Sequence, residues 1–594
     1  MSSELELRFN QIDIDAKKEI ANITATHLQP WSNLNDFRLE DILEYPGNYA
    51  TLESNYTVLD GTFKEFPDNT SNRVWGLFSN ILSNQNGVFA TPISLVFTFN
   101  SPRKTDGISF RFYPFTNDNA STAEIIWYAN TNATGLIRRD TYTLMSNGPI
   151  FEIKEFVEGY RRVDIRFVST NNPIRFLKLY AIDFGIIRFI FDHEIDNCNV
   201  YEEIDNTVES ISLNTLSVTI RTLTPLYSPI TSERYTDIMM ERQPIYLYRN
   251  QLFHRLYFLD AWRDVTGDSI VFEISASDAI SILDMHIFKG GIYNNVLATS
   301  LLDEIFNICF PTRVVRYEID IDIRFTRISG YLPRGSCGLA FQQIMFALNA
   351  TANTAKTVNV LIRSNESLRP AKTYVSLRKQ YMDNYEIKLN PPIYGVSVIS
   401  YSYTQSIEER QIIRNEIFGP GTYEIFFDEP LHSLQFTPSN TQIVERHVNH
   451  VIFRVSQQTE ISLVGRTYVV LEIEHNILGE YRVGVNNVTK RYEGYTLVDR
   501  IKGGVIARRL FIYSQMRINL EASIALDSIE VGDRILMQTN HLDVIGIVNS
   551  IDTLKRTNKG IISLLGNVTL EKDIALRYTG MINSGMDMGV IYAR

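Results

Sequence analysis

The chain has 594 residues, 44% of them hydrophobic and 11% aromatic, so it has material for several buried cores and is not expected to be disordered as a whole. Its formal net charge is −11, and the basic residues are interleaved with acidic ones, which disfavours binding to a nucleic acid. Three cysteines do not make a disulfide framework, and they fit folding in a reducing compartment.

No targeting or membrane segment is expected. Residues 1–8 are acidic and mixed, without the basic start and apolar run of a secretory signal. The longest apolar stretch, 180–191, is interrupted by Asp183 and Arg188. It is shorter than the roughly 20 residues that cross a bilayer.

The first 185 residues divide into two parts. Residues 1–48 predict an N-terminal arm that leads into the next domain. Between 49 and 185, apolar and polar residues alternate in short runs, as at 93–99 and 162–167, and turn formers such as Asp106-Gly107 separate the runs. This period of two predicts a β-sandwich of half-buried antiparallel strands.

The pattern continues as strands over 186–290, which predicts a first β-barrel, and then becomes mixed over 291–390. Apolar residues between 297 and 308 recur at three- and four-residue steps, which predicts a helix that Pro311 ends. Residues 291–390 therefore predict an α+β domain.

Two further elements are expected within 291–390. Strict alternation from Tyr317 to Phe325 predicts a strand with one charged face. Ser336 is placed to cap a helix that carries an apolar stripe up to about Asn349.

The rest of the chain is again rich in expected strands. Residues 391–570 predict one or more β-rich domains, including a second barrel, with one helix-like interruption at 492–507. Residues 571–594 carry scattered glycines among apolar residues and predict a C-terminal arm that packs on a partner. The fold class expected for the whole chain is therefore mainly β and multidomain.

The sharpest catalytic pattern surrounds Cys337, because a cysteine at a helix N-terminus is stabilised as a thiolate. It echoes the nucleophile box of papain-like proteases, with His475 at a spacing that this family uses. However, Gly338 replaces the expected aromatic residue, and His475 falls on the apolar face of a strand. A small core residue at a helix start explains Cys337 better, and no catalytic residue or enzymatic activity is predicted.

Metal and cofactor patterns are incomplete. His447 and His450, with His432 nearby, lie in a region of strand and loop, where we expect the two imidazoles to point to opposite faces. The stretches Asn117-Asp118-Asn119 and Asp68-Asn69 resemble fragments of calcium loops without a full ligand set. No phosphate-binding or dinucleotide-binding loop is found either, so no metal and no cofactor is predicted.

A glycan-binding role is a hypothesis for one segment of the sandwich, because apolar ring faces stack on sugars and amides bind hydroxyls. The residues that this hypothesis names are Trp75, Phe78, Asn80, Asn84 and Asn86. Trp127, in another strand of the sandwich, is expected to be buried.

Several segments carry a resemblance to known families. The segments 49–53, 59–61, 79–83, 87–89 and 173–179 resemble the galactose-binding-like, discoidin-type sandwiches found in tail proteins of Gram-positive bacteriophages. The segments 213–218, 288–293, 328–332 and 335–350 resemble the baseplate or tail hub of tailed phages and of phage-tail-like bacteriocins. Together they span most of residues 45–365.

The resemblance to tail hubs implies a homotrimer in which two similar barrels per chain approximate sixfold symmetry. It implies contacts with the tail tube protein, the central spike protein, the tape-measure protein and other baseplate proteins of a contractile or non-contractile particle. It also implies a place in the virion tail or baseplate, assembled in the bacterial cytoplasm.

The resulting interpretation is a non-enzymatic structural hub with a carbohydrate-binding-like module. A host-surface glycan adhesin of the tail tip is the alternative, and it predicts saccharide binding that is lost on changing Trp75 or Phe78. A cell-wall hydrolase is a third interpretation, and it predicts activity that depends on Cys337.

Overall fold

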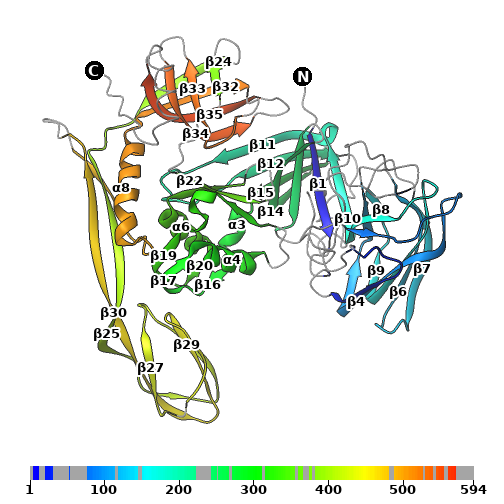
Figure 1. Ribbon diagram of the computed structural model, residues 1–594, viewed down its shortest axis with the longest axis horizontal. Coiled ribbons are helices and arrows are strands. Elements are labelled where there is room, and N and C mark those ends of the chain that lie inside the picture. The colour runs from blue at the N-terminus through cyan, green and yellow to red at the C-terminus, as the bar shows by residue number, and fades with distance from the viewer. Residues whose placement is uncertain are drawn as a thin grey trace.

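The computed structural model describes residues 5–12, 16, 20–30, 32, 53, 76–113, 118–144, 150–222, 242–249, 252–266, 270–310, 315–354, 359–365, 373–376, 381–439, 441–480, 487–525, 529–538, 543–553 and 559–569. Within these residues the chain is mainly β and multidomain, as expected, with several sheets and separate hydrophobic cores (Figure 1). The expected C-terminal arm, 571–594, lies outside the described residues.

The N-terminal β-sandwich has one sheet of five strands. Its order is β2 (Ile20–Ala25), β4 (Val88–Thr105), β9 (Val157–Thr170), β6 (Ala120–Tyr128) and β7 (Leu136–Thr143). The facing strands are β3 (Leu77–Phe78), β10 (Lys178–Phe191), β5 (Ile108–Phe112) and β8 (Ile150–Ile153). Alternate apolar residues of β4 and β9 fill the space between the sheets, and Trp127 is buried there as expected.

The sandwich is joined to the body through β10. The first half of β10 pairs with β5, and its second half pairs with β1 (Leu5–Ile12), which also pairs with β13 (Pro244–Arg249). The expectation that the first residues form an arm is therefore corrected: Leu5 and Leu7 are buried in the core of the body. Leu5 and Leu7 can both be buried because alternate residues face the same side of a strand.

The body contains one large sheet in which two β units meet. The first unit consists of β1, β13, β14 (Leu252–Thr266), β15 (Ile270–Ser277), β12 (Thr215–Thr222) and β11 (Ile195–Glu203). The second consists of β34 (Asp543–Thr553), β35 (Lys559–Thr569), β32 (Ile518–Ala525), β24 (Tyr381–Leu389), β33 (Arg534–Gln538) and β23 (Thr373–Ser376). Antiparallel pairing of β11 with β34 joins the two units.

The expectation of two β-barrels is wrong in one respect. The described strands of the two units form an open sheet and no closed barrel. Closure of the first unit would require its edge strands to pair with each other. Instead, β1 pairs with β10 of the sandwich and β11 pairs with β34 of the second unit. The hydrogen-bonding edges that would close a barrel connect neighbouring units.

An α+β layer lies beside the first unit. It contains α3 (Ile280–Leu283), α4 (Ala298–Cys309), α5 (Ile321–Arg324), α6 (Cys337–Leu348) and the short strands β16 (Ile287–Phe288), β17 (Gly291–Leu297), β18 (Tyr317–Ile319), β19 (Arg327–Leu332), β20 (Gly335–Ser336), β21 (Ala350–Asn353) and β22 (Val360–Ser364). Both helices expected here are confirmed, and Ser336 Oγ accepts the Leu339 N–H at 3.0 Å as the N-cap of α6.

The strand expected from Tyr317 to Phe325 is wrong beyond Ile319. Asp320 ends the strand because its carboxylate accepts hydrogen bonds from Arg363 Nη1 at 2.8 Å and from the Ser364 N–H at 3.0 Å. The backbone carbonyl of Asp320 accepts the N–H groups of the following turn, and α5 begins there. A side-chain contact with β22 therefore overrides the local alternation.

A long ribbon leaves the body from the C-terminal half of the chain (Figure 1). It consists of β25 (Gly395–Phe418) paired antiparallel with β30 (Thr459–Leu478). The far end carries β26 (Gly421–Phe426), β27 (His432–Thr437), β28 (Gln442–Arg446) and β29 (His450–Val455) around their own core. At the near end, β31 (Thr489–Tyr492) and α8 (Arg500–Ser514) pack against the ribbon. The helix expected at 492–507 is found, but it begins only at Arg500 and continues to Ser514.

Candidate functional site

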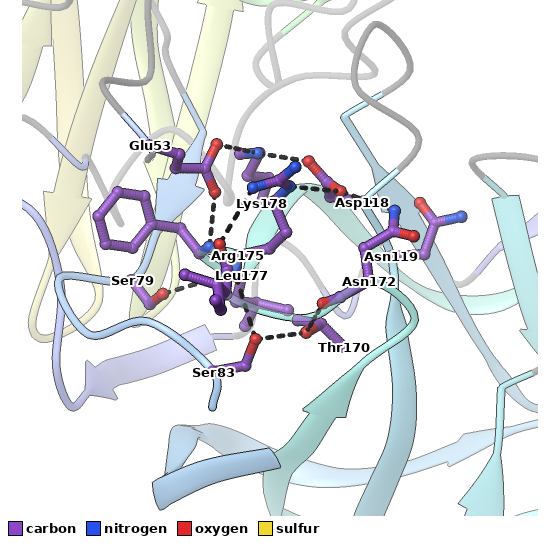
Figure 2. A network of polar contacts seen from close by, with 12 residues as sticks. Glu53, Ser79, Ser83, Asp118, Asn119, Thr170, Asn172, Arg175, Leu177 and Lys178 are labelled. Carbon is purple, nitrogen blue, oxygen red and sulfur yellow. Dashed lines mark hydrogen bonds and ion pairs between the residues drawn. The ribbon is translucent and has the colours of Figure 1, made fainter. Parts of the chain in front are cut away.

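Three buried ionisable side chains meet at one end of the sandwich (Figure 2). Lys178 Nζ lies 2.5 Å from Glu53 Oε2 and 2.6 Å from Asp118 Oδ2. All three side chains are fully buried. Burying charges is costly unless they are paired and hydrogen-bonded, so this group, which we call the Lys178 cluster, is held by its mutual contacts.

Strand β10 and the segment before β6 position two members of the Lys178 cluster, Lys178 and Asp118. Lys178 is the first residue of β10, and its backbone pairs with Phe78 of β3. Its carbonyl also accepts the Tyr113 N–H at 3.1 Å. Asp118 precedes β6, and it is held by Asn172 Nδ2, which donates to its Oδ1 at 2.8 Å.

A fourth charged group lies at the edge of the cluster. Arg175 Nε is 3.5 Å from Asp118 Oδ1, and its side chain is 16% exposed. The two cations and the two carboxylates sum to a formal charge of zero. The cluster is thus electrically balanced, with the arginine on its solvent side.

The loop before β10 is fixed by side chains of the N-terminal part of the sandwich. Its three consecutive N–H groups, from Arg175, Phe176 and Leu177, donate to Ser83 Oγ at 3.1 Å, Glu53 Oε1 at 2.7 Å and Ser79 Oγ at 2.9 Å (Figure 2). Each backbone donor that enters the interior here has a partner. Glu53 therefore fixes both the loop and the lysine.

The residues proposed for glycan binding differ in their exposure to solvent. Phe78 is 1% exposed and packs edge-to-face on Tyr113, so its ring has no open face for a sugar. Trp75 lies outside the described residues. Glycan binding by this segment stays a prediction.

The three asparagines of the same segment are exposed. Asn84 Oδ1 accepts the N–H groups of Asn86 at 2.8 Å and Val88 at 3.0 Å, which makes it part of its own turn. Of the four proposed residues that the structure describes, Asn80 and Asn86 are therefore the exposed ones whose side chains do not hold that turn.

Cys337 and His475 are not brought together. The Cys337 thiol is buried and shares a hydrogen bond with Cys309, whose pKa this bond and burial raise. His475 Nε2 lies 2.9 Å from Ser400 Oγ and packs against α8 at Gly503. The two residues are occupied by different neighbours.

The expectation that His447 and His450 point to opposite faces is wrong. The His447 N–H donates to the His450 carbonyl at 2.9 Å in a tight turn. This turn stacks the two rings with centroids 5.1 Å apart, and burial lowers the pKa of His447. In the part of the chain that the structure describes, no group of three or more histidine, cysteine or acidic residues is arranged to hold a metal ion.

A cavity of about 870 Å³ lies beside α4 and α5. Its lining is mixed: Phe306 and Phe310 are apolar, while Tyr317 donates to Asp303 Oδ1 at 2.6 Å. Burial and Asp303 raise the pKa of Tyr317. Phe325, at its rim, is 71% exposed.

Apolar side chains are also exposed along the ribbon. Val469 and Leu471 of β30 are 59% and 57% exposed, and Ile407 of β25 is 88% exposed. Residues 469 and 471 share one face of the strand because strand side chains alternate. A two-stranded ribbon with such a face is marginal in water unless another surface covers it.

Among the described helices, none combines the length and apolar character needed to span a bilayer. No protein-family model matches the chain, and no curated protein matches it in sequence.

Solved structures that resemble the chain include proteins of phage tails. The 43 kDa tail protein of prophage MuSo2 from Shewanella oneidensis has 10% identity and a TM-score of 0.38, over 62% of this chain and 93% of that one. The prophage tail protein gp18 from Listeria monocytogenes has 10% identity and a TM-score of 0.35, over 67% and 97%.

A carbohydrate-binding module resembles a smaller part of the chain. The family 32 module of NanJ from C. perfringens, solved with galactose, has 11% identity and a TM-score of 0.18, over 30% of this chain and 99% of that one. At these identities and scores, none of the three likenesses assigns an activity or a ligand to this chain.

The Lys178 cluster was not predicted from the sequence. The pattern around Asp118 indicates only an incomplete calcium loop, and Glu53 and Lys178 enter only as members of resembling segments. One signal was available: Lys178 stands in a strand between apolar neighbours, Leu177 and Leu179, where a charge needs a buried partner.

Proposed function

We propose that the chain is a structural component of a phage tail or phage-tail-like particle, the baseplate hub that joins the tail tube to the central spike. Its described residues are organised as β units, each with its own core, connected by strand pairing. Such a chain acts by holding neighbouring proteins in a fixed geometry through extensive interfaces.

The pairing of β11 with β34 carries this proposal. It joins the first and second β units edge to edge, with Val200 opposite Thr553 and Glu203 opposite Ser550. Two β units fixed side by side in one chain are what a trimer needs to present six units to a sixfold tube. The homotrimer and its contacts with tube, spike and tape-measure proteins are parts of the proposal.

The exposed face of the ribbon supports the same function. Val469, Leu471 and Ile407 place apolar surface on a projection that has only two strands over much of its length. In a hub, this surface is covered by an adjacent chain. We therefore expect assembly to depend on the ribbon.

The test is the mass of the full chain in solution by light scattering, with Leu471→Asp as the test variant. Leu136→Asp is the matched control, because Leu136 is similarly exposed, at 61%, on the edge of the sandwich. The expected result is a mass of three chains for the wild type and the control, and a lower mass for Leu471→Asp. A wild-type chain that stays monomeric at every concentration measured would contradict a self-assembling hub.

A host-surface glycan adhesin is the second candidate, favoured by the exposure of Asn80 and Asn86 in one segment of the sandwich. It predicts saturable binding of a galactose-containing saccharide that Asn80→Ala and Asn86→Ala weaken together. Asn84→Ala is unsuitable as a test because it also breaks the turn. Absence of binding to a broad glycan array would leave the sandwich with a structural role only.

A further inference from the structure

The Lys178 cluster combines a nucleophile, an acyl group and a second carboxylate in a site closed to water. We propose that Lys178 and Asp118 become joined by an intramolecular isopeptide bond, with Glu53 as the catalytic residue that moves the protons. Nothing in the proposed hub function requires this bond.

The distances favour the reaction. Lys178 Nζ is 2.6 Å from Asp118 Oδ2, so the nitrogen already contacts the carboxyl group that it would attack. Lys178 is fixed by its backbone contacts in β10, and the Asp118 carboxylate, ahead of β6, is held by Asn172 Nδ2. Holding two reacting groups in contact converts a bimolecular step into an intramolecular one and removes most of its entropic cost.

The surroundings exclude the competing solvent. The Lys178 backbone is paired with Phe78 and bonded to Tyr113, and these two residues are 1% and 0% exposed. Leu177 and Leu179, on either side of the lysine, are each 0% exposed. Water released in such a site is not replaced easily, which favours amide formation over its reversal.

The proton balance closes within the cluster. Glu53 Oε2, 2.5 Å from Nζ, takes one proton from the Lys178 ammonium, and the free electron pair of Nζ forms the new bond to Asp118 Cγ. Glu53 returns this proton to Oδ2, and a second proton from Nζ reaches the same oxygen. The Cγ–Oδ2 bond then breaks and water leaves, so ammonium and carboxylate become amide and water while Glu53 is again a carboxylate.

Asp118 is favoured over Glu53 as the acyl group because a side-chain donor and a cation both lie at its Oδ1, whereas Glu53 Oε1 accepts the uncharged Phe176 N–H at 2.7 Å. Negative charge develops on Asp118 Oδ1 as the nitrogen attacks. Asn172 Nδ2 donates to that oxygen at 2.8 Å, and the Arg175 guanidinium lies 3.5 Å from it. Fixed donors and a cation at a developing oxyanion lower the barrier to acyl transfer.

The bond would act on the connection between domains. β10 begins at Lys178 in the sandwich and ends in the body beside β1. A covalent link at its first residue would prevent a pulling force from stripping this strand from the sandwich. This consequence rests on the proposed function, whereas the bond itself does not.

The test is the intact mass of the denatured full-length chain, followed by mapping of its proteolytic peptides. The expected wild-type mass is below the sequence mass by one water molecule, with the peptides of Lys178 and Asp118 joined. Lys178→Arg, which keeps the positive charge, is expected to show its full sequence mass. Glu53→Gln is expected to lose the bond and run more slowly than wild type on a denaturing gel.

Asp118→Asn is a further test that can be used if the other variants fold poorly. An asparagine amide is also an acyl donor and releases ammonia, so this variant is expected to form the same bond and reach the same final mass as the wild type. A wild-type chain at its full sequence mass overturns the proposal. A mass deficit that maps to Glu53, or that persists in Lys178→Arg, overturns the assignment as well.

Discussion

Arg255 and Glu202 form a buried ion pair inside the first β unit, with side chains 2% and 6% exposed. Glu202 belongs to β11, the strand that also pairs with the second unit, and Arg255 belongs to β14. The pair therefore links the interior of one unit to the strand that holds the other.

Removing one partner of this pair is expected to destabilise the protein strongly. Glu202→Gln leaves the Arg255 guanidinium buried without a counter-charge, and the expected loss is about 3–5 kcal/mol of unfolding free energy. Calorimetry of the thermal transitions is the measurement. The double variant Glu202→Gln with Arg255→Met is the control, and it is expected to recover part of the loss because it removes the unpaired charge. An unchanged transition in Glu202→Gln would show that the pair contributes nothing.

Asp278 is expected to make the stability of the protein fall as the pH rises. Burial raises the pKa of this carboxyl group to about 6, although Thr354 Oγ1 and the Asn214 N–H donate to it. Between the unfolded pKa near 4 and about pH 6, the folded state holds more protons than the unfolded state. Stability from this group is therefore fully present below about pH 4 and falls, by on the order of 3 kcal/mol, as the pH rises to 6 and above.

Melting temperatures of the wild type and Asp278→Asn across this pH range test the point. The asparagine does not ionise, so the variant is expected to lose this part of the pH dependence while other groups contribute equally to both proteins. Parallel curves for the two proteins would exclude Asp278 as the source.

Gly330 is expected to tolerate no side chain. It has φ +144°, and a Cβ at this position would collide with the backbone carbonyl of Thr496. Gly330→Ala therefore forces the segment at 496–497 to move, and we expect a loss of more than about 2 kcal/mol in thermal unfolding.

Gly494→Ala is the matched control for backbone strain alone. Gly494 has φ +84° and open space where a Cβ would lie, so only the left-handed conformation opposes the substitution. The expected cost is about 1–2 kcal/mol. If both variants lose the same stability, the close approach of Thr496 is not what selects glycine at 330.

Ser336 is expected to contribute to stability through its hydroxyl. Its Oγ accepts the Leu339 N–H at 3.0 Å and donates to Asp284 Oδ1 at 2.8 Å. Ser336→Ala removes both bonds, with an expected cost of about 0.5–2 kcal/mol. Ser336→Thr keeps a hydroxyl and is expected to retain most of the stability in the same melting experiment. Equal losses in both variants would argue against the cap.

Local patterns were enough to predict part of this structure. The helix α4, the helix α6 with its Ser336 cap, the burial of Trp127 and the mainly β class all follow from periodicity and capping within short stretches. The strand expected through Asp320 failed because that carboxylate bonds to β22, more than 40 residues away along the chain.

The sequence by itself therefore determined the helices α4 and α6 and the mainly β class, since those preferences depend on near neighbours. Only the tertiary structure decided that β1 joins the body, that β11 pairs with β34 instead of closing a barrel, and that Glu53, Asp118 and Lys178 meet. These contacts join residues far apart in the chain. Strand edges and buried charges need a partner but do not specify which one, so the partner is selected by the packing of the whole fold.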